Sequence, residues 1–215
     1  MAFLTIERDG GILTATMNQP ETRNALTGNT AVQEFVQLCE DVRKDASVKV
    51  LIITAAGPIF SSGGNVKDMK RFFDDALTPD LIREEYRQGI QQIPNALVQL
   101  DVPVICAING PAIGAGLDLT CMCDIRIASE TATFAESFVR VGIVPGDGGA
   151  WLLPRAVGMA KASEMAFTGE PISAQEALAC GLVSRVVAAD QLLPTARALA
   201  AKIAANPGAV MRMTK

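Results

Sequence analysis

The chain has 215 residues, of which 49% are hydrophobic and 20% charged, so it can bury a sizeable core and is expected to form one main domain. Its formal net charge of −4, without a basic block or interleaved aromatic residues, argues against nucleic acid as a partner. It has no histidine, which excludes Ser-His and Cys-His nucleophilic catalysis and every metal site built with histidine.

The N-terminus and the cysteines indicate the cellular setting. The first residues lack the basic start and apolar core of a signal peptide, and no apolar run reaches about 18 residues, so a cytoplasmic protein without a membrane span is expected. The five cysteines are odd in number and never form C-x-x-C, which favours reduced core thiols over disulfides or a zinc site. They are Cys39, Cys106, Cys121, Cys123 and Cys180.

Strand and helix patterns alternate along the first half of the chain. Residues 3–8 and 12–17 alternate in polarity around Asp9-Gly10-Gly11, which predicts a β-hairpin. The patterns that follow are a helix over 29–44, a buried strand over 48–54, a long helical stretch over 79–99 and a buried strand over 102–108.

The second half is mainly helical. Its predicted elements are helices over 114–121, 148–156, 158–167, 173–179 and 189–205, and short strands over 124–128, 132–134 and 182–187. This order predicts an α/β fold with a mostly parallel sheet and helical cover.

Two glycine-rich loops each follow a buried strand, over residues 57–64 and 109–116. Ligands of such sheets gather at the carboxyl ends of strands, and two backbone N–H groups at a helix start could form an oxyanion hole. The alternative is that the glycines only make turns and tight contacts. A dinucleotide fingerprint fails because its third glycine would fall at Leu119, and no G-K-[ST] of a P-loop is present.

Two aspartates are candidate functional groups. Asp118 lies inside an apolar helix, on the same face as the Ala115 amide, and could instead be structural and paired with Arg126. Asp147 lies among glycines where a turn enters a helix, so it could face a ligand or serve as the helix N-cap.

Four motifs in order resemble the crotonase superfamily, that is, the enoyl-CoA hydratase/isomerase family, from Phe3 to Lys215. They occupy residues 21–26, 60–69, 108–119 and 142–149. The resemblance implies a crotonase-like spiral of ββα units over 1–188, followed over 189–215 by the start of a helical C-terminal region shorter than the family's. It also implies an acyl-CoA thioester as substrate, no separate cofactor, and a homotrimer or a dimer of trimers.

The resemblance assigns roles to individual residues. The backbone N–H groups of Gly64 and Ala115 would hold the thioester oxygen, with Asp118 and Asp147 as the carboxylates beside it. Arg23 could face a phosphate of coenzyme A or be an ordinary solvated arginine. The residues expected to bind acyl-CoA are Arg23, Asn24, Ala25, Ser62, Gly63, Asn65, Val66, Gly114 and Phe138.

The chain departs from the family's hydratases at both of their water-activating glutamates. Asp118 stands at the first position and Phe138, which cannot exchange a proton, at the second. Glu136 lies two residues away, so its side chain is expected to point elsewhere. Asp147 stands where some isomerases of the family carry a proton-transferring acid.

These departures favour an isomerase or lyase over a hydratase, in fatty-acid or aromatic-acid catabolism. An isomerase needs one base that removes and returns a proton while the enolate is held. A hydratase working with unusual carboxylates is the second hypothesis. The third is a catalytically silent acyl-CoA-binding or assembly protein, since Phe138 replaces an expected acid.

Overall fold

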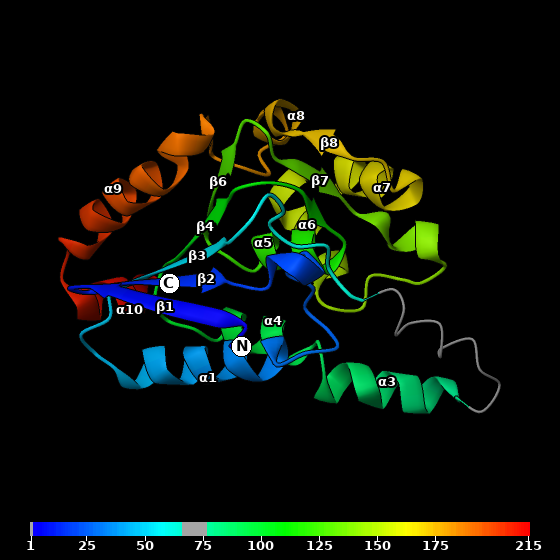
Figure 1. Cartoon of the computed structure of the whole chain (residues 1–215), viewed down its shortest axis with the longest axis horizontal. Helices are drawn as coiled ribbons and strands as arrows, with labels where there is room; N and C mark the ends of the chain where they lie inside the picture. The colour runs from blue at the N-terminus through cyan, green and yellow to red at the C-terminus, as the bar shows by residue number, and fades with distance from the viewer. Residues whose placement is uncertain (1, 66–76) are drawn as a thin grey trace.

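A computed structural model describes residues 2–65 and 77–215. Within them, a six-stranded sheet in the order β1-β2-β3-β4-β6-β9 forms the centre of the fold (Figure 1), and its β1–β2 pair alone is antiparallel. The predicted hairpin and mostly parallel sheet are therefore confirmed. The strands are β1 Leu4–Asp9, β2 Ile12–Met17, β3 Val50–Ala55, β4 Val104–Ile108, β6 Ile125–Ser129 and β9 Arg185–Val187.

A second, three-stranded sheet lies beside the first. Its strands are β5 Ala112–Ile113, β7 Thr133–Ala135 and β8 Ile172–Ser173, with β5 parallel and β8 antiparallel to β7. A bridge from Ser61 to Ala112 joins the loop after β3 to this sheet. The sequence does not predict β5 or β8, because two residues are too few to show an alternating pattern.

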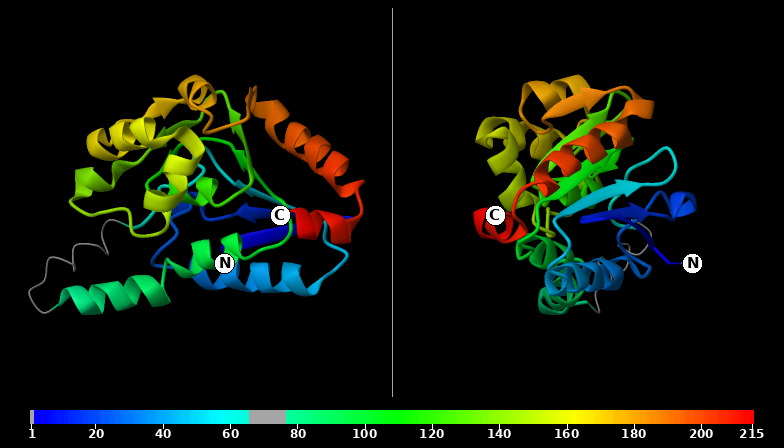
Figure 2. Two further views of the ribbon diagram at one scale, coloured as in Figure 1. Left: turned by 180° about the vertical axis from the view of Figure 1, so that it is seen from behind. Right: turned by 90° about the vertical axis from the view of Figure 1, so that its left-hand side faces the viewer.

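Helices cover both faces of the large sheet (Figures 1 and 2). Alternate residues of β3 point to opposite faces: Leu51 and Ile53 pack towards α1 and α4, whereas Val50 and Ile52 pack towards α9. These helices are α1 Ala31–Lys44, α4 Gln92–Val98 and α9 Leu192–Ala204. Because both faces are covered, the central strands are apolar on both sides, as their sequence indicates.

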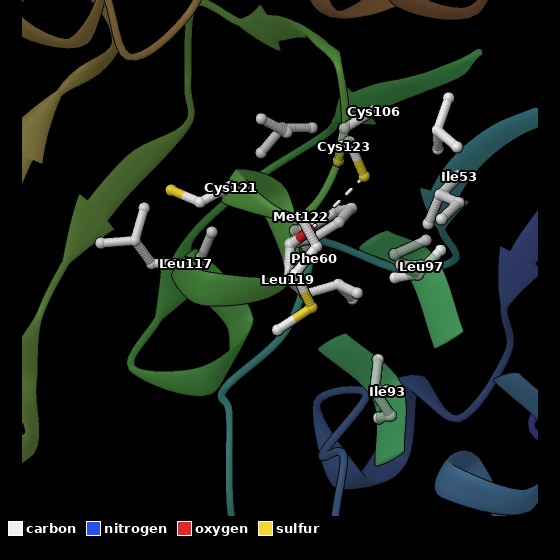
Figure 3. Close-up of a cluster of buried hydrophobic side chains, with 14 of the residues drawn as sticks. Ile53, Phe60, Ile93, Leu97, Cys106, Leu117, Leu119, Cys121, Met122 and Cys123 are labelled. Carbon is white, nitrogen blue, oxygen red and sulfur yellow. Dashed lines mark hydrogen bonds between the residues drawn. The ribbon is translucent and has the colours of Figure 1, made fainter. Parts of the chain in front are cut away.

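Helix α5, Ala115–Cys121, lies inside the protein with all of its residues buried. Figure 3 shows Leu117 and Leu119 of this helix in a cluster of buried side chains that also includes Phe60, Leu97 of α4, Cys106 and Cys123. The predicted core placement holds for four of the cysteines, and Cys180 is half-buried. The other helices are α3 Pro79–Gln88, α6 Gly149–Val157, α7 Met159–Thr168, α8 Ala174–Ala179 and α10 Gly208–Thr214, with short 3-10 turns η1 Pro20–Thr22, η3 Ser137–Val141 and η4 Ala189–Gln191.

The prediction of one long helix over residues 79–99 is wrong. The chain breaks at Gly89, whose φ of −103° and ψ of −117° leave the helical region, so α3 and α4 are separate helices. Helix α3 buries none of its residues and extends away from the sheet (Figure 1), whereas α4 packs into the core. Among the described helices, none has the length and apolar character needed to cross a membrane.

Candidate active site

The two glycine-rich loops meet each other at a distance that only glycine permits. The amide of Ile113 donates to the carbonyl of Ser61 at 3.0 Å. A Cβ on Gly63, whose φ is +78°, would lie 2.5 Å from the carbonyl oxygen of Ile113, and one on Gly116 would lie 2.5 Å from that of Ser61. The glycines therefore place the end of the first loop against the start of α5.

This contact brings two free amides to one cavity. Among the described residues, the N–H groups of Gly64 and Ala115 donate to no protein acceptor. Both residues line a cavity of about 420 Å³. The remaining lining residues are Thr27, Gly28, Asn29, Val32, Asn65, Glu85, Tyr86, Gly89, Ile90, Phe138 and Asp147. An oxygen atom in this cavity could accept both hydrogen bonds, as in an oxyanion hole.

Asn24 braces the first loop from within the protein. It has a left-handed backbone, with φ of 51°, and is fully buried. Its side chain donates to the carbonyls of Ala56 and Ile59 and accepts from the amide of Gln19. Asn24 does not line this cavity, and its side chain instead positions the loop that carries Gly64.

A groove of about 790 Å³ adjoins the cavity and shares with it a wall that includes Gly64 and Asn65. Arg23, which is exposed, Ala25 and Ser62 line this groove together with Glu21 and Thr22 of η1. Gly63 and Gly114 shape the nearby backbone without lining either space. Val66, the last predicted binding residue, lies outside the described residues.

Phe138 closes one side of the cavity with an apolar ring. The ring packs over Gly114, where an added Cβ would lie 3.6 Å from Phe138 Cζ. At this position the family's hydratases would carry a glutamate, and the cavity wall there consists of carbon. No proton can be exchanged from this side of the cavity.

Three buried carboxyl groups lie near one another beside the cavity. Asp118 on α5, Glu136 after β7 and Asp147 before α6 are 0%, 1% and 2% exposed. The carboxyl of Asp118 lies near enough to both of the others to influence their pKa values, although the buried oxygens of Asp118 and Asp147 have no N–H or hydroxyl hydrogen-bond donor among the other described residues. Of the three, only Asp147 lines the 420 Å³ cavity.

This cluster bears on three points from the sequence. As expected, Glu136 does not share the direction of Phe138: it does not line the cavity, and its carboxyl lies near Asp118. Arg126 does not pair with Asp118, since its guanidinium donates to the carbonyls of Leu182 and Cys123. Asp147 is not the N-cap of α6, because that position is occupied by Gly148.

Comparison with known proteins agrees with this geometry. The family model described as enoyl-CoA hydratase/isomerase matches residues 7–215. The chain belongs to the enoyl-CoA hydratase/isomerase family. The resemblance seen in the motifs is thereby confirmed, and with it an acyl-CoA thioester as the class of substrate that the family implies.

The relatives of this chain include proteins named as hydratases and proteins named as isomerases. A probable enoyl-CoA hydratase of Mycobacterium tuberculosis is 36% identical, over 99% of this chain and 79% of its own length. The 1,2-epoxyphenylacetyl-CoA isomerase of Escherichia coli is 34% identical, over 96% of this chain and 78% of its own. The crystal structure of an enoyl-CoA hydratase from Bacillus anthracis superposes with a TM-score of 0.90 at 31% identity, covering 99% of this chain and 81% of that one.

Burial controls the charge of the three carboxyl groups in this family member. It raises the pKa of Asp118 well above the ordinary value, and the neighbouring charges of Asp147 and Glu136 raise it further. Burial also raises the pKa of Glu136 to about 8 and that of Asp147, while hydrogen bonding to Asp118 partly offsets both shifts. The raised pKa makes the carboxylate of Asp147 a stronger proton acceptor than an exposed aspartate.

Helix α3 supplies site residues that sequence reasoning missed. Tyr86 and Glu85 line the cavity, and the Tyr86 ring packs so closely on Gly146 that an added Cβ would lie 2.6 Å from Cε1. Burial and the neighbouring Asp147 raise the pKa of Tyr86, which keeps its hydroxyl protonated. Gln91, just after α3, donates to the carbonyl of Gly146 at 2.6 Å. The sequence shows only a helical pattern over Glu85, Tyr86 and Gln91. Such a pattern does not indicate which part of the protein the helix contacts.

Proposed function

We propose that this protein is an enoyl-CoA isomerase in which Asp147 moves a proton along the acyl chain. The observation that carries the proposal is that Asp147 lines the same cavity as the two free amides of Gly64 and Ala115. The amides would hold the thioester oxygen, and the adjoining groove with Arg23 would receive the coenzyme A moiety. A proton acceptor and an enolate-stabilising pair in one cavity are the parts that a double-bond shift needs.

The proposed reaction balances with one base. For a 3-enoyl thioester, the Asp147 carboxylate takes a proton from C2, and the C–H electron pair enters a dienolate whose oxygen accepts hydrogen bonds from both amides. The double bond then forms between C2 and C3, and the proton returns from Asp147 to C4. The product is the conjugated 2-enoyl thioester, of unchanged mass.

The walls of the cavity favour this reaction over hydration. Water addition in the family uses two carboxylates that hold one water, whereas here one of those positions is Phe138 and the other, Asp118, is fully buried and is not among the described residues that line this cavity. Glu85 is the other carboxylate among the described lining residues, and it comes from a different element, α3. The names of several relatives favour a hydratase, so hydration is the second candidate.

The deciding experiment supplies 2-enoyl-CoA and 3-enoyl-CoA separately and follows the absorbance of the conjugated thioester together with product mass. We expect conjugation to appear from the 3-enoyl substrate without a change in mass. Loss of conjugation with a gain of one water would establish hydration and refute the proposal. Tight binding of both thioesters without turnover would instead support the silent binding protein, a hypothesis that the family match does not favour.

We also propose the homotrimer or dimer of trimers that the resemblance implies. Four apolar side chains of the α6–α7 region are more than 60% exposed, which is unusual for a surface that meets only water. They are Val144, Trp151, Met159 and Phe167. Sedimentation equilibrium measures the mass of the particle directly, and a monomer would contradict this proposal.

A further inference from the structure

The three buried carboxyl groups cannot all be ionised. Among the described residues, no N–H or hydroxyl group of another residue donates to either oxygen of Asp118 or of Asp147, or to Oε2 of Glu136, and the backbone N–H of Asp147 itself only lowers the pKa of its own carboxyl. Two carboxylates in contact repel each other, whereas a carboxyl and a carboxylate share a hydrogen bond. Asp118 touches both of the others, so the two contacts become hydrogen bonds only if the cluster holds two protons.

Exposure to the cavity indicates where the remaining negative charge resides. Asp147 alone borders a space that water or substrate can enter, whereas Asp118 and Glu136 face protein on all sides. A charge is least costly where it can be solvated. The two protons therefore belong on Glu136 and Asp118, and the charge on Asp147.

With the protons placed in this way, hydrogen bonds within the cluster are all donated towards Asp147. We propose that Glu136 is a positioning residue whose neutral carboxyl donates to Asp118, so that Asp118 donates its own proton to Asp147 and holds that carboxylate towards the cavity. The inference rests on the proposed role of Asp147 as the base. It gives Glu136 a function for which its place in the sequence, two residues before Phe138, provides no indication.

The surroundings of the cluster leave few other groups that could set its charge. From the described elements, the titratable groups that act on the three carboxyls are Cys121 on α5 and Tyr86 on α3. The backbone at the start of α6 packs directly on Asp118, where a Cβ on Gly149 would collide with the carboxyl oxygens. Since the thiol of Cys121 and the hydroxyl of Tyr86 are both neutral at ordinary pH, the protons within the cluster determine its behaviour.

Ionisation of Glu136 would reverse the chain of hydrogen bonds. The Glu136 carboxylate would then attract the proton of Asp118, and Asp147 would lose the hydrogen bond from Asp118 while a second negative charge entered the cluster. The pKa of Asp147 would rise and its orientation would relax. Because the pKa of Glu136 is raised to about 8, isomerase activity should fall as pH rises through that value.

The test compares Glu136→Gln, Glu136→Leu and the wild-type protein in pH profiles of kcat/KM. The glutamine amide of E136Q still donates but cannot ionise, so we expect this variant to keep activity at pH 7 within about threefold and to lack the fall near pH 8. E136L, without a donor, should lose about tenfold at pH 7. The exposed Glu170→Gln serves as the matched control and should behave as the wild type.

Infrared difference spectroscopy of the free proteins separates this inference from the function it rests on. The carbonyl band of the protonated Glu136 carboxyl should disappear as the pH rises through about 8 in the wild type and in E170Q. E136Q has no carboxyl at this position and should lose no carboxyl band near that pH. An E136Q profile that falls like that of the wild type would overturn the inference, as would a wild-type protein without this titration. An active Asp147→Asn protein would refute the role of Asp147 itself, whatever the infrared result.

Discussion

The carboxyl groups of Asp118 and Asp147 lie near enough to shift each other's pKa and are 0% and 2% exposed, one on a buried helix and the other on the loop before α6. Such a pair needs a proton, and only Asp147 faces the cavity. Neither residue is therefore an ordinary surface acid. In the proposed mechanism their different surroundings separate the roles of proton holder and proton acceptor, as in other sites where environment divides two carboxyl groups.

Asp147→Asn should reduce kcat for isomerisation by about 10² to 10⁴-fold and leave binding of a substrate analogue nearly unchanged, because the amide fills the same space without accepting a proton. Glu85→Gln is the matched control, since Glu85 is the second carboxylate lining the cavity. We expect it to keep kcat within about threefold. Steady-state kinetics with isothermal titration of the analogue measures both, and a larger loss in E85Q than in D147N would assign the base to Glu85.

Gly63→Ala should disturb both stability and catalysis. Its Cβ would lie 2.5 Å from the carbonyl of Ile113 and 3.0 Å from the amide nitrogen of Ala115, which directly affects the two-amide site. Gly158→Ala is the control: its φ of +79° matches the +78° of Gly63, but a Cβ there meets nothing within 4 Å. We expect G158A to lose about 1 kcal/mol of unfolding free energy and G63A about 1–3 kcal/mol more. Urea unfolding and kcat/KM measure both effects. Equal losses in G63A and G158A would show that the close contact at Gly63 contributes nothing to stability or catalysis.

The sequence predicts those parts of the fold that repeat along the chain. Buried strands show as apolar runs and α1 as a 3.6-residue period, so the sheet and most helices lie within a few residues of their predicted positions. The strand of two residues at Ala112 has no period, and the break at Gly89 depends on how the chain packs after α3. Local pattern carries no information about such contacts.

The sequence predicts the part of the candidate site that consists of backbone N–H groups. The glycines near Gly64 and Ala115 are visible in the sequence because close backbone approach requires them. The approach of Glu136 to Asp118 was not predicted, since the direction of this side chain depends on one residue between β7 and η3 that follows neither strand nor helix geometry. The isomerase preference stays a prediction, because family membership is shared by hydratases and isomerases.

Arg23→Asn should raise KM for enoyl-CoA by about threefold to tenfold and leave kcat unchanged, if the groove that Arg23 lines holds a phosphate of coenzyme A. Asparagine suits the left-handed backbone of Arg23, with φ of 57°, so the change removes charge without adding strain. The same variant assayed with a pantetheine thioester, which lacks the nucleotide, should match the wild type. An equal rise in KM for both thioesters would show that the effect does not come from the nucleotide.

The buried carboxyl cluster should make stability depend on pH in an uncommon direction. An acid whose pKa is raised on folding binds more protons in the folded state, so the free energy of unfolding falls as pH rises between the unfolded and folded pKa values. For Glu136 this window runs from 4.5 to about 8. Wild-type protein should therefore lose stability in urea across that window, a loss to which Asp118 and Asp147 contribute in the same sense.

E136Q should lose less stability than the wild type across that window, because glutamine cannot ionise, while E170Q should follow the wild type. At the acid end the opposite sign applies to Asp45, whose pKa is lowered to about 2 by hydrogen bonds from Ser47 and Arg8, so that its contribution disappears as pH falls towards 2. Urea midpoints measured at several pH values for the three proteins give the slopes. Parallel slopes for E136Q and the wild type would mean that Glu136 is already ionised in the folded protein, and the proposed proton chain would then be untenable.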